Sequence, residues 1–213
     1  MRAGRGRMPV WVWVVIVLCC AVEALVVLGP QPPVSNLRAI AMVWGGFWPV
    51  LLDPQSTGVF PGQRFAMFAT YGFLHGGIAH LAMNMFSLLA LAPELGRMIG
   101  SGRMALVYAV TQIAAAAFYA AMSPPSGPMV GASGAIFGLA GALVAVAFVR
   151  SRKRGLPMGP LARSVAVLIG LNVALTLAMP AIAWQAHLGG ALAGVVLGLL
   201  MAQGRPRTQA RLR

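Results

Sequence analysis

Six apolar runs of roughly 20 residues each divide this chain, and they limit its possible folds more than any other feature. At about 1.5 Å of rise per residue, a helix of that length crosses the hydrocarbon core of a bilayer. The chain has 213 residues, of which 59% are hydrophobic and only 9% charged. The sequence therefore predicts an all-α membrane protein with six transmembrane helices, at residues 9–29, 73–91, 104–122, 131–149, 161–179 and 187–203.

The segments between these runs predict one membrane domain with a basic N-terminus at 1–8 and a basic tail at 204–213. The run at 9–29 is longer than the apolar core of a secretory signal, so we expect a retained helix. Residues 31–70 form a long first loop with Trp44 and Trp48. Tryptophan favours the bilayer interface, so an interfacial loop is expected, although an ordinary exposed loop stays open.

The positive charges predict the orientation of the bundle. With the N-terminus in the cytoplasm, Arg38 and Arg64 are the two of the 16 Lys and Arg residues that lie outside. We therefore expect both termini in the cytoplasm and the long first loop outside. The same distribution accounts for the net charge of +13 without a nucleic-acid partner, because the basic residues lie in short clusters between apolar runs.

The scarcity of acidic residues excludes several chemistries. The chain has three acids, Glu23, Asp53 and Glu94, too few and too scattered for a paired-carboxylate hydrolase or a carboxylate-bound metal. The three histidines could form a metal site only by converging alone, which needs tight geometry. We keep that as a minor alternative and expect neither a metal nor another cofactor.

Polar residues cluster where the second, fourth and sixth runs enter the membrane from the outer face. The second run carries His75, His80 and Asn84, while Ser133 opens the fourth and His187 the sixth. Unpaired polar groups are costly in hydrocarbon, so a shared cluster is expected. His80 and Asn84 are four apart and share one helix face.

Glycine spacing predicts that the fourth and sixth helices pack closely. Gly134 and Gly138 form one small stripe, and Gly190, Gly194 and Gly198 form another. Such packing would bring the Ser133 hydroxyl to the His187 imidazole. The alternative is close packing without any chemistry, which is common in membrane helices.

If the contact forms, it predicts nucleophilic catalysis. Histidine can take the proton of a serine hydroxyl and later protonate a leaving amine. No carboxylate lies near His187 in the sequence, so a dyad is expected. The available donors for an oxyanion are the Ser133 backbone N–H, His80 and Asn84.

Three motifs in chain order resemble those of bacterial rhomboids, which are intramembrane serine proteases. They are His75-Gly-Gly-Ile-Ala-His80-Leu-Ala-Met-Asn84, Gly131-Ala-Ser133-Gly134, and Ala186-His187-Leu-Gly-Gly190 with Gly194. The resemblance covers about residues 66–203. A tyrosine often follows the family's serine by four residues; here Phe137 stands there and can pack on an imidazole.

The resemblance implies a function for these residues. Ser133 would be the nucleophile and His187 the base, with His80, Asn84 and the Ser133 amide as oxyanion donors. His75, Gly131, Gly134, Phe137, Gly190 and Gly194 would support them. The substrates would be single-pass transmembrane proteins, cut in a bacterial inner membrane by a site that faces the periplasm. A catalytically silent relative that binds such clients and a small transporter subunit are the alternatives.

Overall fold

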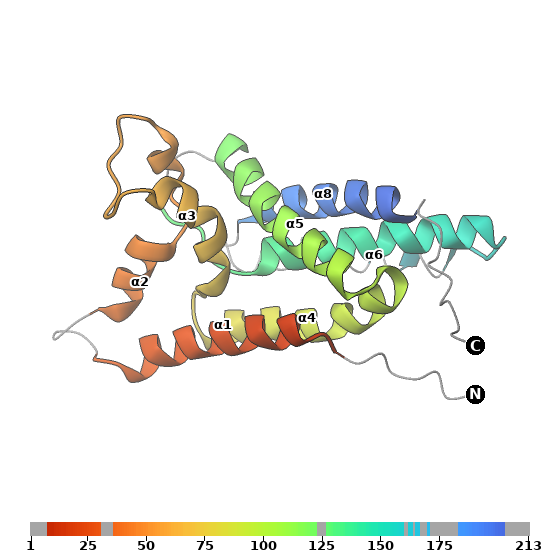
Figure 1. Ribbon diagram of the computed structural model, residues 1–213, viewed down its shortest axis with the longest axis horizontal. Coiled ribbons are helices and arrows are strands. Elements are labelled where there is room, and N and C mark those ends of the chain that lie inside the picture. Colours follow the sequence, from red (N-terminus) through yellow and green to blue (C-terminus); the bar gives the residue numbers. More distant parts are fainter. Residues whose placement is uncertain are drawn as a thin grey trace, which may run out of the picture.

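The apolar runs fold into long helices, as the computed structural model shows (Figure 1). The structure describes residues 8–30, 36–122, 127–159, 162–163, 165–166, 170 and 183–202. Its elements there are α1 (Val10–Leu28), α2 (Leu37–Gly45), η1 (Pro49–Leu52), α3 (Gln63–Thr70), η2 (Tyr71–Phe73), α4 (Ile78–Ile99), α5 (Ser101–Met122), α6 (Ser133–Lys153) and α8 (Trp184–Ala202). In these ranges the extended backbone forms one isolated bridge, between Phe47 and Met129.

Five helices of the described residues are long and apolar enough to cross a membrane. They are α1, α4, α5, α6 and α8. The fifth expected span, at 161–179, lies largely outside the described residues. The described part of the chain is thus an all-helical bundle of several membrane spans.

The second span begins and ends later than its apolar run suggests. The expectation was 73–91, whereas α4 covers Ile78–Ile99. Gly77 precedes the helix with φ +133°, a conformation that L side chains rarely adopt, so this glycine favours a chain turn there. Pro93 lies inside α4 and does not end it. His75 consequently lies in the turn before the helix rather than within the span.

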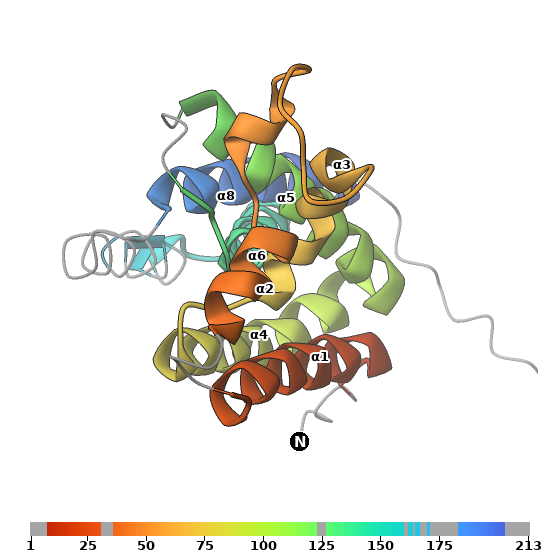
Figure 2. The same ribbon diagram turned by 90° about the vertical axis from the view of Figure 1, so that its left-hand side faces the viewer.

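Helix α6 is the central helix of the bundle. In its most apolar stretch 56% of the residues are buried, compared with 17% in that of α1. Figure 2 shows α6 near the middle, with α4, α5 and α8 around it. Glycines allow this close packing, since a Cβ built at Gly138 would overlap the Thr111 side chain of α5. On the α8 side, a Cβ at Gly194 would overlap the Gly138 carbonyl oxygen.

The long first loop folds into short helices at one end of the bundle. Figure 1 places α2 and α3 at the end where α4, α6 and α8 begin. The Gln63 side chain fastens this segment, because it is buried and donates to the Val43 carbonyl at 2.7 Å while accepting from the Val59 N–H at 2.7 Å. The ring of Phe47 also makes edge contacts with the rings of Phe68 and Tyr71, which connects the residues after α2 to α3 and η2.

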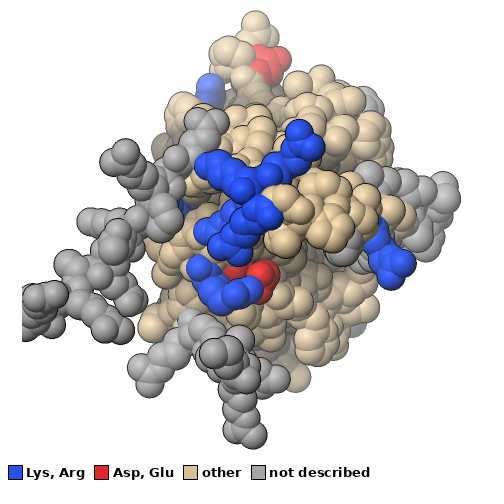
Figure 3. All heavy atoms as spheres, turned by 90° about the vertical axis from the view of Figure 1, so that its right-hand side faces the viewer, with Lys and Arg blue, Asp and Glu red and all other residues tan. Residues whose placement is uncertain are grey.

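The opposite end of the bundle is strongly basic. The last turn of α6 carries Arg150, Arg152 and Lys153, and Arg97 lies in the last turn of α4. Figure 3 shows Lys and Arg side chains gathered on that face. The two ends of the molecule therefore differ in charge, since α2 and α3 contribute one arginine each at the other end, Arg38 and Arg64.

Candidate active site

The hydroxyl of Ser133 and the imidazole of His187 are in contact. Ser133 Oγ lies 2.8 Å from His187 Nε2, within hydrogen-bond distance. His187 is buried, with 5% of its surface exposed, and Ser133 is partly exposed. A serine hydroxyl whose neighbour is an imidazole nitrogen can lose its proton to that nitrogen, which is the arrangement of an activated nucleophile.

Backbone packing between α6 and α8 sets this contact. A Cβ built at Gly190 would overlap the Gly134 carbonyl oxygen, so α8 can approach α6 this closely only with glycine at position 190. Gly134 is equally confined, because its Cβ would lie 2.5 Å from the Ala115 Cβ of α5. The helices that carry the two reactive side chains are therefore in near backbone contact.

Two further features of α6 shape the site. Phe137 stacks on the His187 ring, with ring centroids 4.4 Å apart and planes 11° from parallel. This fixes one face of the imidazole. Ser133 is the first residue of α6, where backbone N–H groups have no partner within the helix and carry the positive end of the helix dipole. A developing negative charge would be stabilised there.

His80 approaches the serine from α4. Its Nδ1 accepts a hydrogen bond from the Gly76 N–H at 3.2 Å. A Cβ built at Gly131 would lie 2.9 Å from His80 Nε2 and 3.7 Å from Ser133 Oγ, so this edge of the ring and the serine hydroxyl both border Gly131. Gly131 has φ +121° and donates its N–H to the Tyr71 carbonyl at 2.9 Å. Any side chain at Gly131 would be both strained and in collision with His80.

Asn84 lies one helical turn after His80 on α4. It is buried, and its Nδ2 donates to the His80 carbonyl of the same helix at 3.0 Å. An amide nitrogen carries two hydrogens, so one remains for another acceptor.

His75 lies beside His80 but makes no side-chain hydrogen bond among the described residues. Its two ring nitrogens are buried without a partner, and the two imidazole centroids are 5.2 Å apart. Burial, assisted by the neighbouring His80, lowers the pKa of His75 to about 4. In the part of the chain that the structure describes, no three His, Cys, Asp or Glu side chains are grouped as a metal ion would require.

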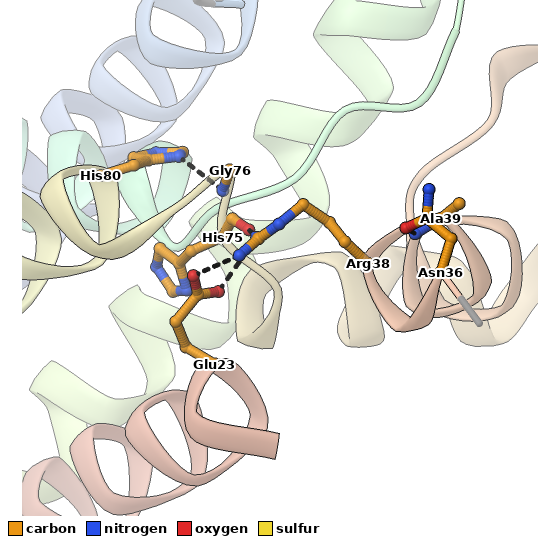
Figure 4. A network of polar contacts seen from close by, with 7 residues as sticks. All are labelled: Glu23, Asn36, Arg38, Ala39, His75, Gly76 and His80. Carbon is orange, nitrogen blue, oxygen red and sulfur yellow. Dashed lines mark hydrogen bonds and ion pairs between the residues drawn. The ribbon is translucent and has the colours of Figure 1, made fainter. Parts of the chain in front are cut away.

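The sequence did not reveal the polar network next to this site. Glu23 of α1 is buried and pairs with Arg38 of α2 at 2.7 Å, and Arg38 also donates to the His75 carbonyl at 2.8 Å (Figure 4). Buried Gln112 of α5 was also missed; neither of its amide atoms has a partner among the described residues. A glutamate inside an apolar run was the signal that could have indicated the first network.

Two charged residues, Glu94 and Arg64, take no part in the described site. Glu94 forms an exposed ion pair with Arg97 on α4 at 2.6 Å. Arg64 donates to the Ser56 carbonyl at 3.4 Å within the first loop. Both contacts are local to their own segments.

The fold and the site together define a class: an integral, multi-pass helical membrane protein with a serine and a histidine in contact between two of its spans. The family model for the Rhomboid domain matches residues 62–204. The chain belongs to the rhomboid family.

Curated relatives agree with this assignment. The chain is 37% identical over 121 residues to Rhomboid protease GluP of Bacillus subtilis, covering 57% of this chain and 23% of that protein. It is 33% identical over 132 residues to RHOMBOID-like protein 4 of Arabidopsis thaliana, covering 61% and 32%. It is 31% identical over 160 residues to Putative rhomboid protease YdcA of Bacillus subtilis, covering 75% and 78%. The match thus spans less than a third of the first two relatives and most of the third.

Proposed function

We propose that this protein is an intramembrane serine endopeptidase that cleaves transmembrane segments of single-pass membrane proteins. The observation that carries the proposal is the 2.8 Å contact between Ser133 Oγ and His187 Nε2 in a chain of the rhomboid family. Relatives whose names include "protease" support it.

In the proposed reaction, Ser133 and His187 act as a dyad. His187 Nε2 takes the hydroxyl proton while Ser133 Oγ attacks the carbonyl carbon of the scissile peptide bond. The resulting tetrahedral intermediate collapses, and the same imidazole gives its proton to the leaving amine. Water then enters and repeats the sequence on the acyl-enzyme, releasing the second product and restoring the serine.

The oxyanion of the intermediate would be bound by donors from two helices. The Ser133 backbone N–H at the start of α6 is one, and His80 Nε2–H and the free amide hydrogen of Asn84 are the others. Donors fixed before the reaction begins stabilise the charge without reorganising. Gly131 supports this function because it leaves room between His80 and Ser133.

We further propose six spans, with both termini in the cytoplasm of a bacterial cell and the site facing the periplasm across the inner membrane. Two observations support this topology: the sequence has a further apolar run at 161–179, long enough for one more span, and the basic end of α6 lies opposite the end that carries the site (Figures 1 and 3). Basic residues favour the cytoplasmic side.

The test is cleavage of a model single-pass protein coexpressed with the wild type, Ser133→Ala or His187→Ala. We expect a product band with the wild type alone. Asn84→Ala should retain activity lowered by about 10²- to 10³-fold, the usual effect of losing one oxyanion donor. Ser87→Ala, which changes an exposed serine of α4, is the matched control and should cleave normally.

Labelling with a fluorophosphonate separates the protease from a silent relative. A reactive Ser133 becomes labelled in the wild type and not in Ser133→Ala. Equal cleavage by wild type and Ser133→Ala would contradict the proposal, as would undiminished turnover by His187→Ala. A wild type that binds the model protein but is neither labelled nor active would favour the silent alternative.

A further inference from the structure

One peptide unit connects an ion pair to the His80 ring (Figure 4). The unit joins His75 to Gly76. Its carbonyl oxygen accepts a hydrogen bond from Arg38 Nη1 at 2.8 Å, and its N–H donates to His80 Nδ1 at 3.2 Å. Both polar groups of a single peptide plane are therefore engaged, one by a cation and the other by an imidazole.

Arg38 is itself held in a fixed direction. Its Nη2 donates to Glu23 Oε1 at 2.7 Å and its Nη1 lies 3.3 Å from Glu23 Oε2, a two-point contact with the carboxylate. Glu23 is 3% exposed, so its charge needs this partner. Because the guanidinium is planar, a two-point contact also fixes the direction of its remaining N–H groups. One of these donates to the His75 carbonyl.

The hydrogen bond at Nδ1 determines which nitrogen of His80 carries the proton. A neutral imidazole has one donor and one acceptor nitrogen. Because Nδ1 accepts from Gly76, the proton lies on Nε2, the nitrogen that borders Gly131 together with Ser133 Oγ. The other tautomer would set two N–H groups against each other at Gly76 and present a lone pair toward the serine, where it would repel an oxyanion.

The charge on Arg38 strengthens this preference. A carbonyl that accepts from a cation withdraws electron density through the amide, which makes the amide N–H a better donor. We infer that Arg38, oriented by Glu23, is a positioning residue that holds His80 in the Nε2–H tautomer through the His75–Gly76 peptide. As an inference about catalysis it rests on the proposed function, since the donor matters only if an oxyanion forms.

The tautomer can be read directly by ¹⁵N NMR of the full chain labelled at histidine. The sequence has three histidines, so three ring-nitrogen pairs are expected, and His80→Gln identifies the His80 signals by their loss. In the wild type, His80 Nδ1 should resonate as an unprotonated nitrogen and Nε2 as a protonated one. In Arg38→Gln we expect a mixture of the two tautomers. Arg38→Lys, which keeps a cation within reach of both acceptors, should retain the wild-type pattern.

Kinetics provide a second measurement. Arg38→Gln should lower kcat roughly five- to tenfold with KM unchanged, the effect expected when one neutral hydrogen bond is weakened in the transition state alone. Because Arg38→Gln leaves Glu23 buried without its partner, the variant could unfold. The double variant Glu23→Gln, Arg38→Gln removes both charges and should show the same mixture of tautomers in a folded protein. Arg64→Gln is the control, because Arg64 belongs to the same first loop and its side chain donates to the Ser56 carbonyl within that loop.

An unchanged His80 tautomer in both Arg38→Gln and the double variant would overturn the inference, whatever happens to cleavage. A mixed tautomer with raised KM and unchanged kcat would overturn the catalytic part of it. The NMR result does not depend on protease activity. Failure of the proposed function would instead appear as a wild type with the Nε2–H tautomer and no cleavage.

Discussion

The two halves of the candidate site are held by different physical means. Ser133 and His187 are brought together by backbone packing of α6 against α8, where Gly190 lies on the Gly134 carbonyl. His80 is placed by hydrogen bonds, through a turn that Arg38 and Glu23 anchor from α2 and α1. In the first, the backbone half, the two helices can hardly move relative to each other because their backbones are in contact. The second, the polar half, depends on charged side chains whose interactions water and neighbouring groups can weaken.

Replacing Gly190 by alanine should have the largest effect on the cleavage rate, because it changes the backbone contact between α6 and α8. In Gly190→Ala the new methyl group would collide with the Gly134 carbonyl, forcing α8 away from α6. Overpacking of this kind typically costs about 1–3 kcal/mol of stability. A shift of about 1 Å between catalytic groups can lower a rate by about 10². We expect at least that loss in cleavage rate, measured together with the midpoint of thermal unfolding.

Gly102→Ala is the matched control. A Cβ at this helical position of α5 meets nothing within 4 Å, so cleavage should be unchanged and stability equal or slightly higher. A Gly190→Ala enzyme as active as this control would show that the dyad does not depend on the closeness of the two backbones.

The contrast also explains what the sequence could predict. Glycines four residues apart indicate a close helix contact, so a local sequence pattern was enough to predict that α6 packs against α8. Glu23 and Arg38 are 15 positions apart, and His75 is a further 37 beyond Arg38, with no periodicity to connect them. The end of α4 was missed because the apolar run stops near Pro93 although the helix continues to Ile99. The span at 161–179 stays a prediction.

An intermediate effect is expected from pH on the polar half. Burial lowers the pKa of His75 from 6.5 to about 4, with a further contribution from His80. Between these values the unfolded chain binds a proton that the folded protein does not. The contribution of His75 to the free energy of unfolding is therefore complete above about pH 6.5. It falls as the pH drops toward 4, by up to about 1.4 kcal/mol per pH unit.

His75→Phe should remove this contribution. The His75 ring nitrogens have no partners among the described residues, so an apolar ring of similar size loses no hydrogen bond there, and the backbone carbonyl that Arg38 needs remains. The measurement is thermal unfolding in detergent from pH 7 to pH 4. Other groups titrate alike in both proteins, so the difference between the two slopes isolates residue 75. Equal slopes would mean that the His75 ring is accessible to protons in the folded state.

The smallest expected effect concerns the one side-chain contact that supports the backbone half. Phe137 stacks on His187 at a centroid distance of 4.4 Å, and such pairs contribute about 0.5–1.5 kcal/mol. Phe137→Leu keeps an apolar side chain but removes the flat face, so kcat should fall roughly two- to tenfold. Phe137→Tyr keeps the ring and should retain wild-type kcat.

The size of this loss measures how much of the dyad geometry the backbone alone provides. If Gly190 and its neighbours already fix the imidazole, Phe137→Leu will fall at the lower end of the range and its pH–rate profile will match the wild type. A loss as large as that of Gly190→Ala would mean that stacking, rather than helix packing, holds His187 against Ser133. In that case both halves of the site would depend on side chains, and the difference between them would disappear.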